Sequence, residues 1–284
     1  MKNNFAAYFQ LAKPRLLALA LATTLVGFFL AAAGSVNYGV LLSALAGAAL
    51  IGAGANSLNQ FLERDIDAKM RRTENRPLPS QKLGATAVLV FGLAAAVAGL
   101  IQLVITVNAL TAFLAAATLA SYVALYTPLK RVTHLNTFVG AIPGALPSVM
   151  GWTAAGGRLG VEAAILFCMV YLWQIPHFYA IAWVYREDYA RAGLRMVTDL
   201  DVNGRGIAWR LFFYCLMLVP VTLLPTFSRM AGWAYFVVSG LAGIGFIFFA
   251  LRLVLDAMAQ AKRFVSLSII YLTILIVALM ADKA

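Results

Sequence analysis

The sequence has few charged residues and few cysteines for its length of 284 residues. Only 12% of its residues are Asp, Glu, Lys or Arg, about half the share of roughly 25% found in soluble domains. No polar stretch is long enough to form a separate soluble domain with a core of its own. The two cysteines, Cys168 and Cys215, both lie inside apolar segments, which favours packing over a disulfide or a metal pair.

Long apolar segments fill most of the chain, which is 63% hydrophobic. Each is near the roughly 20 residues that a helix needs to cross the hydrocarbon layer of a bilayer. We therefore predict an all-α, polytopic membrane protein, with one transmembrane domain over residues 1–284 and nine helices around a central cavity. The predicted spans are 16–34, 38–60, 86–106, 108–126, 136–155, 161–184, 208–226, 231–251 and 265–281.

The basic residues are distributed unevenly between the two ends of these spans. Of the 22 Lys and Arg, all except Arg158, Arg229 and Lys283 fall on the side of the N-terminus. This bias predicts a cytoplasmic N-terminus and an outer C-terminus in the cell inner membrane. It also accounts for the net charge of +11, so that charge does not indicate binding to nucleic acid. Polar residues gather in three loops on the cytoplasmic side, near 64–84, 126–136 and 186–210, which we expect to cap the cavity.

A first acidic motif follows the second predicted span. Residues 59–78 read NQFLERDIDAKMRRTENRPL and hold nine of the 33 charged side chains. Asn59, Glu63 and Asp67 recur every four residues, so on a helix they form a column of oxygen ligands, while Asp65 points away and is expected to pair with Lys69. Such oxygens beside several guanidinium groups suit a divalent cation that holds a phosphate or diphosphate. The guanidinium groups belong to Arg71, Arg72 and Arg76.

A second motif follows the sixth predicted span. Residues 173–193 read WQIPHFYAIAWVYREDYARAG, in which His177, Tyr185 and Asp188 fall at helical spacing on one face. Asp188 therefore lies just beyond the cytosolic end of span 6, much as Glu63 and Asp67 lie just beyond the end of span 2, a repetition that indicates an internal duplication. The two acidic ends could bind one metal ion each or share one diphosphate. Simple interfacial charge is the alternative for Asp188.

These motifs together resemble the UbiA superfamily of intramembrane prenyltransferases. The resemblance rests on AKPR at 12–15, the segment 59–78, YTPLKRVTHLNTFVGAIPGALPSVMGW at 126–152, and WQIPHF with EDYARAG in 173–193. RTENRPL and the TPLKR run are similar to the branch that acts on heme. The resemblance implies nine transmembrane helices, acidic motifs on helices 2 and 6, and Mg²⁺ bridging to an isoprenoid diphosphate.

The same resemblance implies a reaction and its partners. The reaction would transfer a farnesyl group from farnesyl diphosphate to a vinyl group of heme b (protoheme IX), with addition of water, giving heme O. Heme A synthase or a terminal oxidase would be the protein partner. Two alternatives stay open: an aromatic acceptor such as a quinone precursor, or a non-catalytic membrane protein that handles heme.

Matching the family's motifs position by position gives the candidate site residues. The metal ligands would be Asn59, Glu63, Asp67 and Asp188, with Tyr185 flanking the second motif as a further catalytic residue. The diphosphate would be bound by Arg72, Arg76, Lys130 and Arg131. Because ring faces attract cations, the rings of Trp173, Tyr126 and Trp152 are candidates to contact the heme or the prenyl group, with helix packing as their alternative role.

His177, one of only two histidines, matches the histidine of the family's PHF segment. An intramembrane histidine is a functional candidate, and three roles are open: axial ligand to heme iron, proton acceptor, or hydrogen-bonded structural residue. The chain also departs from the family pattern. Residues 194–198 read LRMVT and lack two prolines, and Glu187 stands where lysine is common. These departures put the loop geometry and the number of metal ions in question.

Overall fold

The computed structural model describes residues 2–32, 34–201 and 203–284. Residue 1, residue 33 in the first predicted span and residue 202 in the third loop lie outside these ranges. The described residues form helices, with no β-strand among them apart from an isolated bridge between Ala231 and Lys283. The chain folds as two compact units, Met1–Gly157 with Glu187–Arg195, and Arg158–Arg186 with Met196–Ala284. That residues 1–284 act as one domain stays a prediction.

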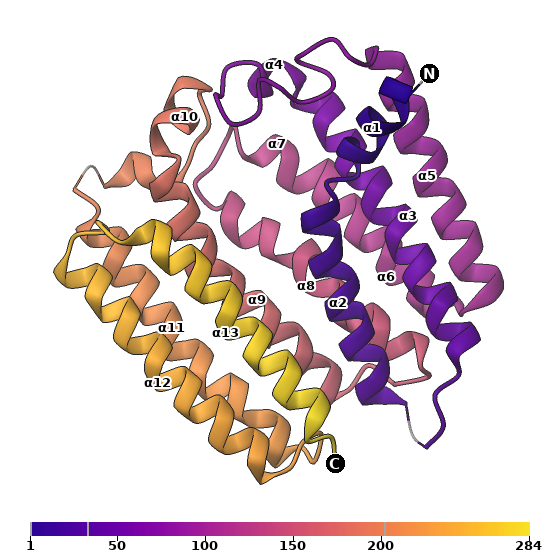
Figure 1. Cartoon of the computed structure of the whole chain (residues 1–284), viewed down its shortest axis with the longest axis vertical. Helices are drawn as coiled ribbons and strands as arrows, with labels where there is room; N and C mark the ends of the chain where they lie inside the picture. Colours follow the sequence, from indigo (N-terminus) through magenta and orange to yellow (C-terminus); the bar gives the residue numbers. More distant parts are fainter. Residues whose placement is uncertain (1, 33, 202) are drawn as a thin grey trace. The chain divides into compact units, whose positions relative to one another are not determined.

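The first unit contains the whole first acidic motif and the part of the second motif that includes Asp188. Helices α3 and α5 pack along one another, and α8 packs against α2, α6 and the π-helical turn η1 (Figure 1). The short helix α10 belongs chiefly to this unit although it follows a helix of the other. The elements are α1 (Lys2–Leu11), α2 (Pro14–Ala31), α3 (Tyr38–Leu62), α4 (Arg64–Asp67), α5 (Ala85–Thr106), α6 (Ala109–Ala120), η1 (Ser121–Tyr126), α7 (Thr127–Leu129), α8 (Asn136–Ala154) and α10 (Arg186–Arg191).

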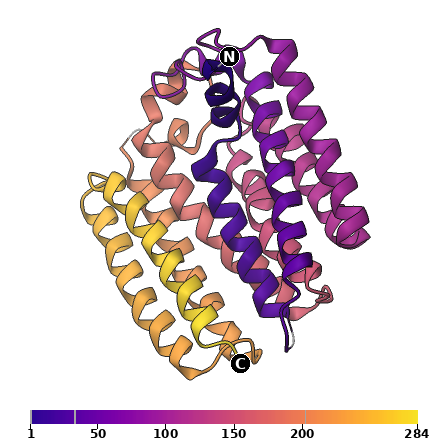
Figure 2. The ribbon, with the colours of Figure 1, turned by 45° about the vertical axis from the view of Figure 1, so that its right-hand side comes forward.

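The second unit is a bundle of four long helices. Helix α11 packs against both α9 and α12, and α13 packs against α9 and α12, so the helices form a closed four-membered group (Figure 2). A short 3₁₀ turn, η2 (Val197–Leu200), precedes the bundle's second helix. The long helices are α9 (Val161–Val184), α11 (Arg205–Phe227), α12 (Trp233–Leu255) and α13 (Ala261–Ala281).

Within the described ranges, eight helical segments are long and apolar enough to cross a membrane. They coincide with eight of the nine predicted spans, and α6, η1 and α7 together form one of them, Ala109–Leu129. The all-helical membrane fold predicted from the apolar runs is thus confirmed by length and composition. The segments are Pro14–Ala31, Tyr38–Leu62, Ala85–Thr106, Ala109–Leu129, Val161–Val184, Arg205–Phe227, Trp233–Leu255 and Ala261–Ala281.

The remaining predicted span, 136–155, forms helix α8, but its composition is less apolar. Most of its side chains are buried within the first unit, and Pro143 and Pro147 lie inside it. Its small residues allow close packing: a Cβ added at Gly151 would overlap the carbonyl of Thr24 on α2. Small residues of this kind let membrane helices approach closely. Helix α8 therefore packs closely against α2. The first residue of α2, Pro14, directly follows Lys13, a residue of the candidate site.

Candidate functional site

The first acidic motif keeps its helical spacing where α3 is followed by α4. Backbone bonds join Glu63 N to Asn59 O (2.9 Å) and Asp67 N to Glu63 O (2.7 Å), so the four-residue repeat continues across the junction. Asn59, Glu63 and Asp67 are 1%, 5% and 0% exposed, respectively. Asp65 is exposed and lies 3.7 Å from Arg64, so its predicted pairing with Lys69 is wrong. The three repeated residues are thus buried, whereas the charged side chain of Asp65 between them is exposed to solvent.

Each buried carboxylate of the first unit contacts a cation from elsewhere in the same unit. An uncompensated buried charge is strongly destabilising, so these contacts explain how the unit keeps three carboxylates inside. The arrangement also places several positive charges beside the acidic groups. The ion pairs are Lys130–Glu63 (2.8 Å), Arg76–Asp67 (2.7 Å) and Arg191–Asp188 (3.1 Å).

Lys13 is a site residue that the motif analysis did not select. Its Nζ donates to Asn59 Oδ1 at 2.8 Å, and the Nδ2 of the same asparagine donates to Thr127 Oγ1 at 3.0 Å. Lys13 precedes α2 with a left-handed backbone (φ 50°, ψ 66°), a conformation that is uncommon for a residue with a side chain and clusters at functional sites. The available signal was a lone lysine in AKPR, directly before an apolar span.

Two polar side chains of α3 fix the position of Lys13. Asn56 Nδ2 donates to the carbonyl of Ala12, and Gln60 Nε2 donates to the carbonyl of Leu11, both at 2.9 Å. These bonds satisfy carbonyls at the end of α1, which have no partner within that helix. The last turn of α1 is thereby tied to the helix that carries the acidic motif, and the lysine that follows is directed at Asn59.

The π-helical turn η1 brings the loop after residue 126 into the site. Thr127 Oγ1 donates to the carbonyl of Tyr122 at 2.8 Å, five residues earlier, and accepts from Asn59. Such single π turns shift the register of a helix and are frequent at functional sites. Beyond the turn, the Lys130 ammonium lies 4.4 Å from the centre of the Tyr126 ring and 2.8 Å from Glu63.

Burial and the neighbouring charges alter the protonation of these groups. Burial lowers the pKa of Lys13 to about 7, and the nearby cations Arg76 and Lys130 act in the same direction. Burial alone would raise the pKa of Glu63, but the Lys130 ammonium beside it holds that pKa below its ordinary value. Burial opposes the charge of Lys130, yet the adjoining Tyr126 and Glu63 raise its pKa. Glu63 and Lys130 are thus a charged pair at neutral pH.

The second acidic motif meets the loop that follows the first. Asp188 Oδ1 accepts from the backbone N–H of Arg71 at 3.4 Å, and Arg72 Nη2 donates to the Tyr189 hydroxyl at 2.7 Å. Helix α10 accordingly lies beside the loop after α4 (Figure 1). Asp67 and Asp188, which are 121 positions apart in the sequence, belong to the same compact unit. A shared site requires Asp67 and Asp188 to lie in the same part of the fold, and this condition is met; the shared site itself stays a prediction.

A sequence profile of the UbiA prenyltransferase family matches residues 20–280. The chain belongs to this family. Two relatives named protoheme IX farnesyltransferase are similar over nearly the whole length. The one from Solibacter usitatus is 41% identical over 286 residues, covering 97% of this chain and 98% of the relative. The one from Anaeromyxobacter sp. is 42% identical over 270 residues, covering 95% and 90%.

Several solved structures share the fold of this UbiA family member. A digeranylgeranylglyceryl phosphate synthase superposes with a TM-score of 0.83 at 17% identity, covering 99% of both chains. A UbiA homologue from Archaeoglobus fulgidus bound to DMAPP and Mg²⁺ superposes with a TM-score of 0.70 at 14% identity, covering 96% of this chain and 99% of the other. Together with its eight candidate spans, family membership makes this chain a multi-pass membrane protein.

The acidic residues of this UbiA chain suit Mg²⁺ in their chemistry. Carboxylate and amide oxygens are the ligands that Mg²⁺ prefers, and it keeps several waters rather than requiring a full protein cage. Among the described residues, no three acidic, histidine or cysteine side chains converge on one point. The metal-ligand role of Asn59, Glu63, Asp67 and Asp188 therefore stays a prediction.

Other residues selected from the family resemblance lie in different surroundings. Arg131, beside Lys130, is exposed. Trp152 is half-buried near the end of α8, about 24 Å along the helix axis from Asn136, at 1.5 Å per residue. Tyr185 ends α9 in the second unit and is 38% exposed. The functional roles of these side chains stay predictions.

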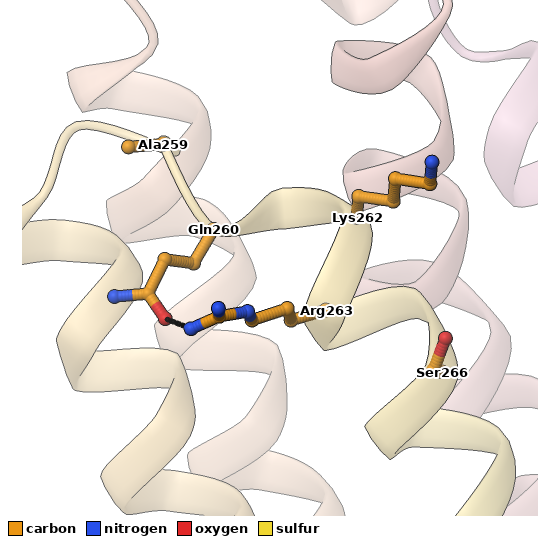
Figure 3. Close-up of a pocket in the computed structure, with 5 residues that line it drawn as sticks. All are labelled: Ala259, Gln260, Lys262, Arg263 and Ser266. Carbon is orange, nitrogen blue, oxygen red and sulfur yellow. Dashed lines mark hydrogen bonds between the residues drawn. The ribbon is translucent and has the colours of Figure 1, made fainter.

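A hollow of about 560 Å³ opens at the start of α13 in the second unit. Figure 3 shows its lining, Ala259, Gln260, Lys262, Arg263 and Ser266, with Arg263 directed toward Gln260 and Lys262 directed away. Arg263 Nη1 donates to Gln260 Oε1 at 3.3 Å. Both cationic side chains are exposed, so this is an open polar hollow rather than an enclosed site. It contains none of the acidic residues that the motifs selected.

Replacing Lys130 with Met is expected to destabilise the first unit by about 3–5 kcal/mol. The Glu63 carboxylate would lose its ion-pair partner while staying buried. Unfolding in mixed micelles of increasing SDS content measures the change. Arg131→Met is the matched control, because this neighbouring side chain is exposed and its loss should leave stability unchanged. Equal stability of the two variants would contradict the role assigned to the Lys130–Glu63 pair.

Proposed function

We propose that the chain transfers a farnesyl group from farnesyl diphosphate to a vinyl group of heme b and, with addition of water, forms heme O. The bond between farnesyl C1 and the diphosphate oxygen breaks, and a bond forms from C1 to the vinyl carbon. Water supplies the hydroxyl group of the product, and one proton and diphosphate are released. Support comes from full-length relatives named protoheme IX farnesyltransferase, at 41% and 42% identity.

The observation that carries the proposal is that acidic residues of both motifs lie in one compact unit beside several cations. Ionisation of an allylic diphosphate requires stabilisation of the departing negative charge, and fixed positive groups provide this electrostatically. The first unit supplies cations from three segments that are distant in the sequence. Lys13 precedes α2, Arg72 and Arg76 follow α4, and Lys130 follows α7.

In this proposal the cations of the site bind the diphosphate. Arg72, Arg76, Lys130 and Arg131 are the binding residues proposed from the family motifs, and Lys13 joins them on the basis of its contact with Asn59. Asn59, Glu63, Asp67 and Asp188 would hold Mg²⁺. Bound Mg²⁺ would act as a Lewis acid on the diphosphate oxygens. A solved UbiA homologue bound to GPP and Mg²⁺ supports this choice of metal and ligand class.

The orientation and surroundings of the protein complete the proposal. The bias of Lys and Arg supports a cytoplasmic N-terminus and an outer C-terminus in the cell inner membrane. The family profile over residues 20–280 supports one prenyltransferase domain. The proposed product would pass to heme A synthase or a terminal oxidase. Tyr126, Trp152 and Trp173 remain proposed contacts of the prenyl group or heme, and Tyr185 remains a proposed catalytic residue.

A competition between two acceptors tests the proposed reaction. Protein in lipid nanodiscs receives labelled farnesyl diphosphate, Mg²⁺ and equal amounts of heme b and 4-hydroxybenzoate. We expect the label on heme, with a product mass equal to heme b plus a farnesyl group and a hydroxyl group. Label only on the benzoate would establish the aromatic-acceptor alternative. Tight heme binding with no labelled product, in a preparation that is folded, would establish a non-catalytic heme-handling protein.

A further inference from the structure

His177 of the second unit contacts a serine on another helix of the same unit. His177 Nδ1 on α9 and Ser268 Oγ on α13 are 2.6 Å apart, a distance that requires a hydrogen between them. Ser268 Oγ also donates to the carbonyl of Val265 at 2.7 Å. His177 is 8% exposed and Ser268 is fully buried. This pair lies outside the unit that contains Asn59, Glu63, Asp67 and Asp188.

The number of hydrogens available fixes the direction of each bond. A serine hydroxyl has one hydrogen to donate and accepts through its lone pairs. The carbonyl of Val265 can only accept, so the hydroxyl hydrogen lies on that contact. The hydrogen between Ser268 and the imidazole must therefore come from Nδ1 of His177. The opposite assignment would leave two oxygen atoms 2.7 Å apart with no hydrogen between them.

The indole of Trp173 holds the imidazole in the same orientation. Its ring stacks on His177 with centroids 4.9 Å apart and an angle of 20° between planes. Its Nε1 donates to the carbonyl of Ser268 at 2.7 Å. One serine thus accepts from both aromatic side chains of α9, through its hydroxyl and its carbonyl. Trp173 has used its only donor in this contact.

The hydrogen bond to Ser268 uses Nδ1 of His177, so the other ring nitrogen, Nε2, takes no part in that contact. A neutral imidazole that carries its hydrogen on Nδ1 has a lone pair on Nε2. Histidines that bind metal ions commonly donate their other ring N–H to a neighbouring acceptor, which fixes the tautomer and the ring orientation. Ser268 occupies the place of that acceptor.

We infer that Ser268 is a positioning residue: it holds His177 in the Nδ1–H tautomer, so that the Nε2 lone pair binds the iron of the heme substrate. The identity of the iron rests on the proposed function, whereas the tautomer rests on the hydrogen bonds alone. This assignment selects the axial-ligand role among the three that the sequence left open for His177. In this arrangement the Trp173 indole stacks on the His177 imidazole. Its N–H donates to the carbonyl of Ser268 and not to the substrate.

Nitrogen-15 NMR of histidine-labelled protein in nanodiscs tests the tautomer without heme. The chain has two histidines, so a His134→Gln background leaves the signals of His177 alone. We expect a protonated Nδ1 and an unprotonated Nε2, and a loss of this preference in Ser268→Ala. Ser268→Thr, which keeps the hydroxyl, should retain it, as should Ser266→Ala, which alters an exposed serine of the same helix. A hydrogen on Nε2 of the unaltered His177, or a Ser268→Ala spectrum identical to it, would overturn the inference.

Heme titration followed by absorption and electron paramagnetic resonance tests the iron ligand. We expect a nitrogen-ligated ferric spectrum that is absent in His177→Ala. Loss of an outer hydrogen-bond partner typically lowers the affinity of a metal site 10- to 100-fold, so Ser268→Ala should weaken heme binding by at least about tenfold, with recovery in Ser268→Thr. An unchanged iron spectrum in His177→Ala overturns the ligand assignment.

The outcomes for the inference and for the proposed function can be told apart. If the iron spectrum depends on His177 but no farnesyl group is transferred, the proposed function fails and the role of Ser268 stands. If farnesyl transfer to heme proceeds while the iron spectrum is unchanged in His177→Ala, the inference fails and the proposed function stands.

Discussion

Asp67→Asn is expected to lower the rate of farnesyl transfer by about 100-fold or more, the loss typical of removing one preorganised electrostatic group. The Asp67 side chain is fully buried, and both of its oxygens accept from Arg76 Nη1, at 2.8 and 2.7 Å. Asparagine keeps the size of the side chain but removes the negative charge that holds Arg76 and would attract Mg²⁺. Initial rates with labelled farnesyl diphosphate and heme b in nanodiscs measure the effect.

Asp65→Asn is the matched control for this prediction. It makes the same chemical change two residues earlier on α4, but Asp65 is exposed and its ion pair with Arg64 is long, at 3.7 Å. Its rate should equal that of the unaltered protein. Because Asp67→Asn also disrupts a buried ion pair, rates are expressed per folded molecule, with the folded fraction measured by size-exclusion chromatography. Equal rates for the two variants would show that the charge of Asp67 has no catalytic role.

Patterns within a single helix were sufficient to predict the transmembrane segments and the acidic column. Apolar length alone located eight spans, because the bilayer imposes a minimum number of apolar residues on each helix. The four-residue spacing placed Asn59, Glu63 and Asp67 together, and it survives the junction between α3 and α4. Matching positions at the ends of two spans predicted that Asp188 would join them, and the structure places Asp188 beside Arg71.

Contacts between helices account for what the sequence did not reveal. The selection of Lys13 required knowing that Asn56 and Gln60 hold the end of α1 against α3. The role of Thr127 depends on a π turn whose residues, SYVALY, read as ordinary apolar helix. The sequence predicted α8 as an ordinary apolar span. In the structure most of its residues are buried by neighbouring helices, and this burial allows the helix to contain Asn136 and two prolines. Such features depend on tertiary packing, which single-helix patterns do not record.

The pairing of every buried carboxylate with a cation leads to an expectation for metal removal. Excess EDTA should stop farnesyl transfer, with a loss of at least about 100-fold, and added Mg²⁺ should restore it. The same treatment should not unfold the protein. Many metal sites leave carboxylates in mutual repulsion when the ion is removed, but here Glu63, Asp67 and Asp188 each contact a positive side chain. Without substrate, EDTA should shift the thermal midpoint by less than about 3 °C, roughly 1 kcal/mol for a chain of this size.

The same pairing predicts that Mg²⁺ and the diphosphate bind together. Mg²⁺ at Glu63 or Asp67 would compete with Lys130 and Arg76 for the charge of these carboxylates, and a buried cation that loses its partner is unfavourable. A diphosphate supplies that partner, since its oxygens accept charge-assisted hydrogen bonds from both cations. We therefore expect little stabilisation from Mg²⁺ alone, and a raised thermal midpoint when Mg²⁺ and a non-hydrolysable farnesyl diphosphate analogue are added together. Strong stabilisation by Mg²⁺ alone, or marked unfolding in EDTA, would show that these cations do not neutralise the carboxylates in the free protein.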